Sequence, residues 1–403
     1  MTHSFDFRSR TRLISEPGGV ARLGELAASL GGKRVLLVTD PHIVAAGHCA
    51  RGEDALRSAG LEVFRFEDVH ENPTSADVQR CAAFAADHAV DLVVGFGGGS
   101  CLDTAKGCCF LLACGGRMED YQGYGKVSAP MLPLIAVPTT AGTGSECQSY
   151  ALIAREDTHQ KMACGDPKAA PAVALLDPEL TLTQPRQVTV ATGLDAVTHA
   201  LECAVTRAAN PVSLLFAREA FRLLHTHFAG VLLRPHEVAA RAAMQLGAAY
   251  AGMAIENSML GAAHSAANPL SAHYDVTHGQ AVAVMLPHVM AFNATDPDVR
   301  AGYRDLAAHA GLVGPDDSDH VAMARLLAAV DGMLEAAAFA RSLADHGLNR
   351  ADIPMLAAEA AGQWTAQFNP RPITAADFAQ LYTEALEGRR PGIDASMAAH
   401  DLT

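Results

Sequence analysis

The hydrophobic pattern of the chain changes near residue 185, and this change limits the folds that the chain can adopt. Before that point, short apolar runs alternate with helix-like stretches, and most runs end at a glycine, proline or aspartate. The runs are 35–38, 63–66, 91–96, 134–137 and 172–176. Apolar strands separated by helices are typical of a parallel sheet that helices cover on both faces. We therefore expect an α/β domain over residues 1–185.

The second half of the chain has the composition of helices. From about residue 187 strand-like alternation disappears, and Ala, Leu, Glu, Arg and Met dominate. We predict helical stretches over 211–228, 236–253 and 321–346. Breaks between helices are expected at Pro235, Gly261 and Pro269. An all-helical domain over 186–403 follows, and a chain of 403 residues is long enough for two domains.

Charge and hydropathy exclude several classes of partner. The net charge is −14, so the chain has no electrostatic footprint for nucleic acid or anionic lipid. No apolar run approaches the roughly 18 residues that span a bilayer. The N-terminus lacks the apolar core of a signal peptide. We expect a cytoplasmic protein.

The cysteines indicate a reducing environment. There are nine, none lies after residue 203, and no Cys-x-x-Cys occurs. Neither a disulfide framework nor a zinc ribbon fits this pattern. We expect reduced and mostly buried thiols.

Three segments that follow strands offer groups for a nucleotide. Gly97 to Ser100 form a strand-to-helix turn whose amides suit a pyrophosphate, although a tight structural turn is the alternative. Asp40 closes the first strand, where it could accept from a ribose hydroxyl or simply cap the next helix. The segment 138–146 carries three threonines and two glycines, and it could cradle a ligand or be a plain loop.

Four side chains could hold a metal. Asp195 and His199 are spaced i and i+4, so they share one face if their segment is helical. His264 and His278 frame a second run with apolar neighbours. Three imidazoles and one carboxylate suffice for a divalent transition metal with positions left for substrate. The alternative is an ordinary solvated pair among the 18 histidines of the chain.

Together these segments resemble the iron-containing alcohol dehydrogenase family, in order and spacing over nearly the whole chain. The segments that carry the resemblance are 97–106, 138–146, 177–181, 193–202, 261–264, 278–293 and 369–371. The resemblance implies a dinucleotide-binding α/β domain, a helical domain and a cleft between them, an architecture shared with dehydroquinate synthase.

The resemblance also implies site residues. It assigns a metal, Fe²⁺ with Zn²⁺ as the alternative, to Asp195, His199, His264 and His278. It assigns NAD contacts to Asp40, Asn72, Gly98, Gly99, Ser100, Asp103, Thr139, Thr140, Thr143 and Lys161. From the residues alone, the Asn-Pro-Thr segment that contains Asn72 would be interpreted as a turn.

One position departs from the family. Members commonly have His-x-x-x-His in the third motif, and here the second histidine is replaced by Asn268. An amide does not take up a proton near pH 7, so a proton relay cannot pass through Asn268 as it would through histidine. His273 is the candidate substitute.

The implied reaction is hydride transfer between NAD(H) and a primary or small secondary alcohol, or its aldehyde or ketone. A metal- and NAD-using lyase of the dehydroquinate-synthase type and a metal-free maleylacetate-reductase-like enzyme are the alternatives, and the intact ligand set argues against both. A non-catalytic nucleotide-binding protein is favoured only by Asn268. We also expect a homodimer or higher homo-oligomer.

Overall fold

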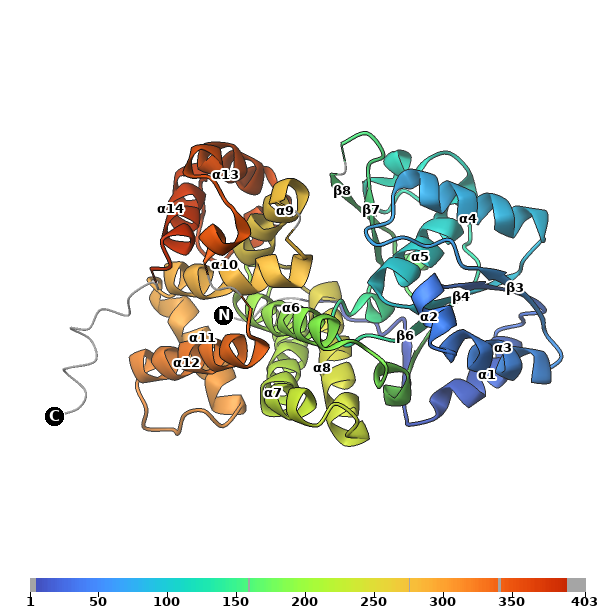
Figure 1. The fold of residues 1–403 in the computed structure, drawn as a ribbon, viewed down its shortest axis with the longest axis horizontal. Coiled ribbons are helices and arrows are strands. Elements are labelled where there is room, and N and C mark those ends of the chain that lie inside the picture. The colour runs from blue at the N-terminus through green and yellow to red at the C-terminus, as the bar shows by residue number, and fades with distance from the viewer. Residues whose placement is uncertain (1–4, 159, 275, 340–341, 390–403) are drawn as a thin grey trace. The chain divides into compact units, whose positions relative to one another are not determined.

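The computed structural model describes residues 5–158, 160–274, 276–339 and 342–389. The chain forms two compact units. One unit contains Arg8–Pro185 together with Pro235–Gly252. The other, which is mainly helical, contains Arg186–Arg234, the described residues from Met253 onward and the described residues before Arg8. Figure 1 shows the elements of each.

A six-stranded parallel sheet organises the first unit, in the order β1-β9-β6-β4-β2-β3. Its strands are β1 (Arg12–Ser15), β2 (Arg34–Val38), β3 (Glu62–Phe66), β4 (Leu92–Gly97), β6 (Leu134–Pro138) and β9 (Val173–Leu176). Five of them match the predicted apolar runs, so the expected fold class is confirmed. The edge strand β1 was missed because only its two central residues are apolar.

Both faces of the sheet are covered, as its continuous apolar strands require. Along β2, Val35 and Leu37 join one core with α1 (Leu23–Ser29) and α3 (His48–Ser58). Leu36 and Val38 point the opposite way, into a core shared with α4 (Ser75–Asp87) and α5 (Gly99–Cys114). The helix α2 (Pro41–Ala45) follows β2 directly. The helix α5 likewise follows β4, so the carboxyl ends of both strands lead into helix N-termini.

A second, three-stranded sheet was not predicted. It has the order β5-β8-β7, with β5 (Gly123–Tyr124), β7 (Tyr150–Ala154) and β8 (Lys161–Gly165). The β7–β8 pair is an antiparallel hairpin. Strand β8 begins with lysine and ends with glycine, and this weak strand signal explains why it was missed.

The helical unit contains α6 (Arg186–Val205), α7 (Pro211–Leu233), α9 (Ala262–Tyr274), α10 (His278–Asn293), α11 (Pro297–His309), α12 (Asp319–Ala337), α13 (Ile353–Gly362) and α14 (Ala375–Leu386). The described part of this unit has no strand, which confirms the all-helical prediction. Pro235 and Gly261 do lie between helices.

Two helix predictions were wrong. The stretch 321–346 is not one helix, because α12 ends at Ala337 and Ala338 adopts the left-handed conformation with φ 58°. Pro269 does not break the chain but lies inside α9. A proline in a helix removes one backbone donor and need not end a helix that is held by tertiary packing.

The helix α8 (Val238–Glu256) belongs mostly with the α/β unit, because residues 235–252 group there. Gln245 in α8 donates through Nε2 to the carbonyl of Pro138 at 3.0 Å. Helical composition alone could not show which unit this helix joins.

All nine cysteines are free, and all but the half-buried Cys114 are buried, as expected. Within the described residues, the helices are each too short or too polar to serve as a membrane span.

Candidate functional site

The helix α6 positions the first two predicted metal ligands. Asp195 and His199 lie one turn apart on its buried face, and both are at most 5% exposed. His199 Nε2 lies 3.4 Å from Asp195 Oδ1. The expected i, i+4 geometry is therefore present.

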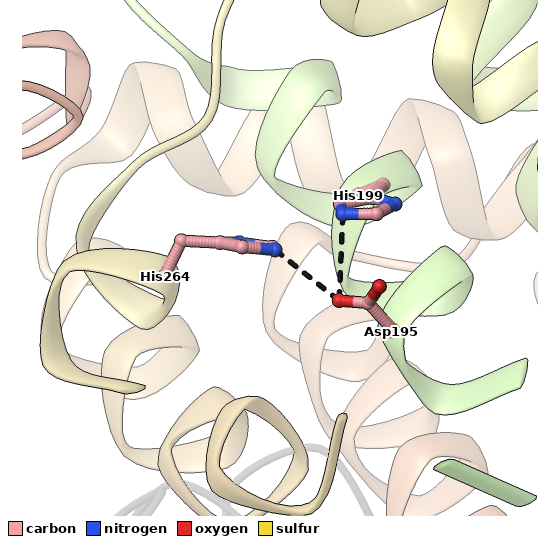
Figure 2. A group of neighbouring side chains, drawn as sticks. All are labelled: Asp195, His199 and His264. Atoms are coloured by element: carbon pink, nitrogen blue, oxygen red, sulfur yellow. Dashed lines mark ion pairs between the residues drawn. The ribbon is translucent and has the colours of Figure 1, made fainter. Parts of the chain in front are cut away.

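His264 and His278 approach the same oxygen from two other helices. His264 Nε2, from the first turn of α9, lies 3.3 Å from Asp195 Oδ1. His278 is the first residue of α10, and its Nε2 lies 3.8 Å from that oxygen. Figure 2 shows His199 and His264 directed at the carboxylate of Asp195. The structure thus brings all four predicted ligands together.

Close packing of α10 on α6 places His278. A β-carbon at Gly279 would lie 2.1 Å from the carbonyl oxygen of Ala191, so only glycine permits this approach. His278 stays partly open, with 28% of its side chain exposed, whereas the other three ligands are buried. The cluster is therefore accessible on the His278 side.

The donor set fits a divalent transition metal. Asp195 Oδ1 and His264 Nε2 are buried and, among the described residues, neither atom has a hydrogen-bond partner of proper geometry. The ligand atoms of Asp195, His199 and His264 lie within 4.8 Å of one another. Buried polar atoms without partners are costly, and a shared cation would satisfy them. Nitrogen and oxygen donors without thiolate suit iron or zinc.

Electrostatics within the cluster agree with this fit. Burial alone would raise the pKa of Asp195, but the three neighbouring imidazoles outweigh it and hold this pKa well below its usual range. Burial would lower the pKa of His264, but Glu202 and Asp195 raise it to about 9. Asp195 therefore stays a carboxylate, which is the form that can bind a cation.

The predicted phosphate turn opens a helix. Gly98 is the N-cap of α5, and Gly99 and Ser100 begin that helix directly after β4. A β-carbon at Gly99 would lie 2.7 Å from Thr143 Cγ2, so the turn and the 138–146 segment are in contact. Thr139 donates its backbone amide to the carbonyl of Gly97 at 3.0 Å. Two of the three predicted nucleotide segments thus form one continuous surface.

Asp40 caps the helix after β2. Its Oδ1 accepts from the amides of His42 and Ile43, which confirms the capping alternative. Its Oδ2 accepts from Cys101 Sγ at 3.3 Å. Because Cys101 is in the first turn of α5, Asp40 lies next to the phosphate turn. The ribose contact stays a prediction.

Asn72 and Lys161 lie in neighbouring segments. Asn72 is exposed and has φ 53°, which agrees with the turn interpretation. The next residue, Pro73, accepts from the amide of Ala154, and Ala154 pairs with Lys161 across the β7–β8 hairpin.

Asp103 lies beneath the phosphate turn in a buried polar network. Its Oδ1 accepts from Ser145 Oγ at 2.6 Å, and its Oδ2 accepts from the amide of Leu152. Lys106 Nζ donates to Ser145 Oγ, to the Ser145 carbonyl and to the Tyr150 carbonyl, all within 2.7 Å. Burial raises the pKa of Asp103 against the opposing effect of Lys106. Sequence reasoning assigned no role to Lys106 or Ser145, although a lysine within an apolar helix is a usable signal.

Glu146 provides a test of pH dependence. Burial raises its pKa to about 7 from 4.5. The folded carboxyl thus binds a proton more tightly than the unfolded one, so stability falls as pH rises from 4.5 to about 7. The loss is about 3–4 kcal/mol at ~1.4 kcal/mol per pKa unit. When unfolding is measured above neutral pH, we expect Glu146→Gln to raise the midpoint of the transition. When it is measured under acidic conditions, the midpoint should change little. Glu25→Gln, at an exposed glutamate, is the control. A stabilisation that does not depend on pH would contradict this account.

The two proton-relay candidates differ in position. Asn268 lies one turn after His264 in α9 and donates through Nδ2 to Gln363 Oε1 at 3.0 Å. His273 is in the last turn, 38% exposed, and its Nε2 pairs with Glu359 at 2.9 Å. Nine residues of α9, a rise of roughly 13 Å, separate it from His264. Asn268 therefore lies one helical turn from His264, whereas His273 lies more than two turns away.

Known proteins resemble this chain over nearly its whole length. A family model described as iron-containing alcohol dehydrogenase matches residues 10–178, and the model of the family's C-terminal domain matches 189–386. The NAD-dependent methanol dehydrogenase of Bacillus methanolicus is 34% identical over 92% of this chain and 96% of its own length. The lactaldehyde reductase of Escherichia coli strain K12 is 32% identical over 91% and 96%. A crystal structure of a 1,3-propanediol oxidoreductase superposes with a TM-score of 0.91 at 32% identity, covering 95% of this chain and 100% of that one.

Proposed function

Because the chain belongs to the iron-containing alcohol dehydrogenase family, we propose that it transfers hydride between NAD(H) and a primary or small secondary alcohol, or its aldehyde or ketone. The observation that carries this proposal is the single buried oxygen, Asp195 Oδ1, which faces three imidazole Nε2 atoms within 3.8 Å.

We assign the metal to Asp195, His199, His264 and His278, with Fe²⁺ as the expected ion and Zn²⁺ as the alternative. When bound, the cation supplies Lewis-acid stabilisation of charge on the substrate oxygen. The protein's own part is to direct three imidazole nitrogens and one carboxylate at a common point. The partly exposed His278 side is where a small substrate would reach this point.

We assign NAD(H) to the surface formed by the phosphate turn and the 138–146 segment. When bound, the nicotinamide cofactor supplies the hydride chemistry. The amides of Gly98, Gly99 and Ser100 at the start of α5 would hold the pyrophosphate. Thr139, Thr140 and Thr143 would add donors, with Asp103 supporting the loop from below. Asn72 and Lys161 would lie toward the adenosine.

We also propose domains over 1–185 and 186–403, with residues 235–252 grouping with the first domain in space. We further propose a cytoplasmic location and a homodimer or larger homo-oligomer. Their support is the change of secondary structure at residue 185, the acidic net charge and the family.

Asp40 is expected to select NAD over NADP. A carboxylate beside the phosphate turn would accept from the ribose hydroxyls and repel a 2′-phosphate. We expect Asp40→Gly to reduce the preference for NADH over NADPH in kcat/KM. Asp40→Asn keeps a capping side chain without the charge, and it therefore separates repulsion from helix capping. A wild type that prefers NADPH would rule out this role.

Asn268 is expected to position ligands without passing a proton. Suppose that the histidine which other family members have at this position passes a proton. The wild-type protein, which has asparagine there, should then oxidise alcohols slowly at neutral pH and faster under alkaline conditions. General acid–base assistance is worth about 10²–10⁴-fold, so Asn268→His should raise the neutral rate and flatten the profile. Asn268→Ala is the control, because it removes the amide and adds no titrating group. An unchanged pH–rate profile in Asn268→His would exclude this position from proton transfer. His273 stays a secondary candidate, tested by His273→Ala in the same assay.

The proposed function is tested by metal quantification on anaerobically purified protein together with NADH oxidation on a panel of small aldehydes. Stoichiometric metal with turnover supports it. Stoichiometric metal without turnover of any aldehyde or ketone would favour the lyase. Turnover without metal would favour a maleylacetate-reductase-like enzyme. A protein with no bound metal and no turnover would be a non-catalytic nucleotide-binding protein.

A further inference from the structure

The start of helix α9, which carries His264, is held by two buried side chains from distant parts of the helical unit. Glu202 of α6 accepts from the amide of Gly261 at 3.0 Å through Oε2 and from the amide of Ala263 at 2.6 Å through Oε1. Asn369 Oδ1 accepts from the amide of Ala262 between them at 3.3 Å. Three successive backbone donors that a helix leaves unpaired are thereby satisfied.

Glu202 also bonds directly to the imidazole of His264. His264 Nδ1 donates to Glu202 Oε2 at 2.6 Å. Because a carboxylate only accepts, this bond places a proton on Nδ1 and directs Nε2 toward Asp195. Both side chains are at most 6% exposed, so water does not weaken the contact. Glu202 therefore orients the ring and fixes the helix start with the same two oxygens.

Asn369 is itself held in one orientation. Its Nδ2 donates to Asn293 Oδ1 and to the Arg371 carbonyl, each at 2.7 Å, while Asn293 Nδ2 donates back to its Oδ1 at 3.0 Å. Asn293 ends α10, the helix that His278 begins. The network therefore links the helices of all four predicted ligands.

We propose that Glu202 and Asn369 are positioning residues that hold His264 as a metal ligand, an inference that rests on the proposed metal-dependent function. The need for a carboxylate follows from the number of donors. Glu202 meets three N–H groups, and a glutamine would direct its own NH₂ at one or two of them whichever way it turned. If Glu202 only capped the start of α9, its bond to His264 Nδ1 would not be needed. Residues that hydrogen-bond a metal-bound histidine typically contribute 10–100-fold to metal affinity.

The test measures metal affinity directly, by chelator competition with Zn²⁺ and Fe²⁺ on wild type and Glu202→Gln. We expect Glu202→Gln to bind both ions 10–100-fold more weakly while its circular dichroism spectrum stays native. Asn369→Ser, which shortens the second anchor, should weaken binding by less. Glu359→Gln is the matched control, because it removes the other glutamate that pairs with a histidine of α9, at an exposed site. Its metal affinity should equal that of the wild type.

A second measurement needs no variant to fold. In wild-type protein labelled with ¹⁵N-histidine and loaded with Zn²⁺, the His264 Nδ1–H proton should give a downfield signal that exchanges slowly. Wild-type metal affinity in folded Glu202→Gln, or a His264 ring whose Nδ1 carries no proton, would overturn the inference and leave the proposed function standing. A wild type that binds neither Zn²⁺ nor Fe²⁺ would instead overturn the proposed function.

Discussion

Replacing His264 by Ala is expected to remove stoichiometric metal and nearly all activity while the fold is kept. His264 Nε2 is a buried nitrogen directed at Asp195, and its loss leaves only two imidazoles around that oxygen. A Lewis acid lowers the activation barrier by several kcal/mol, so its loss corresponds to a decrease in kcat of about a thousandfold or more. Metal analysis, steady-state kinetics and circular dichroism measure the three parts of this expectation.

The control for His264→Ala is His309→Ala. His309 also pairs with a glutamate, Glu219, but its side chain is 42% exposed and lies on α11. His309→Ala should keep wild-type metal content. If His264→Ala retains one metal per chain, the ligand assignment is wrong.

Replacing Lys106 by Met is expected to be the most destabilising of the changes considered for the α/β unit. Lys106 is fully buried, and its ammonium group makes three hydrogen bonds and lies 3.9 Å from Asp103. Its removal would leave a buried carboxylate and two buried carbonyls without their cationic partner. Breaking a buried ion pair in this way costs about 3–5 kcal/mol. Denaturant unfolding measures the change in unfolding free energy.

Lys168→Met is the matched control for Lys106→Met. Lys168 also pairs with a buried aspartate, Asp166, and donates to the Val127 carbonyl, but 45% of its side chain is exposed. Solvent screening should limit its effect to about 1 kcal/mol or less. Similar losses in the two variants would show that the buried network has no special part in stability.

Much of the fold follows from local patterns in the sequence. The strand β4 is apolar at every position and ends in glycine, so its sequence predicts a buried parallel strand. The end of α12 could not be predicted in the same way, because nothing in its alanine-rich sequence marks the left-handed Ala338. The placement of α8 with the α/β unit depends on contacts such as Gln245 with Pro138, which are 107 residues apart in the chain.

The same distinction holds for the site. Asp195 and His199 could be paired from sequence because helical spacing alone brings them together. The role of Glu202 could not, because His264 is 62 residues away and nothing local indicates the contact. Lys106 and Tyr150, which are 44 residues apart, pose the same problem. Local spacing thus identifies ligand pairs, whereas the groups that support them depend on how helices pack.

The most direct test of a metal-dependent NAD(H) oxidoreductase is an anaerobic titration of the metal-free wild type with Fe²⁺, followed by NADH oxidation with a small aldehyde. The account predicts that activity rises in proportion to added Fe²⁺ and reaches its maximum at one ion per chain, with the same end point for bound metal. Full activity before any metal is added would contradict the account. A maximal activity that is unchanged when one of the four ligands is replaced would also contradict it.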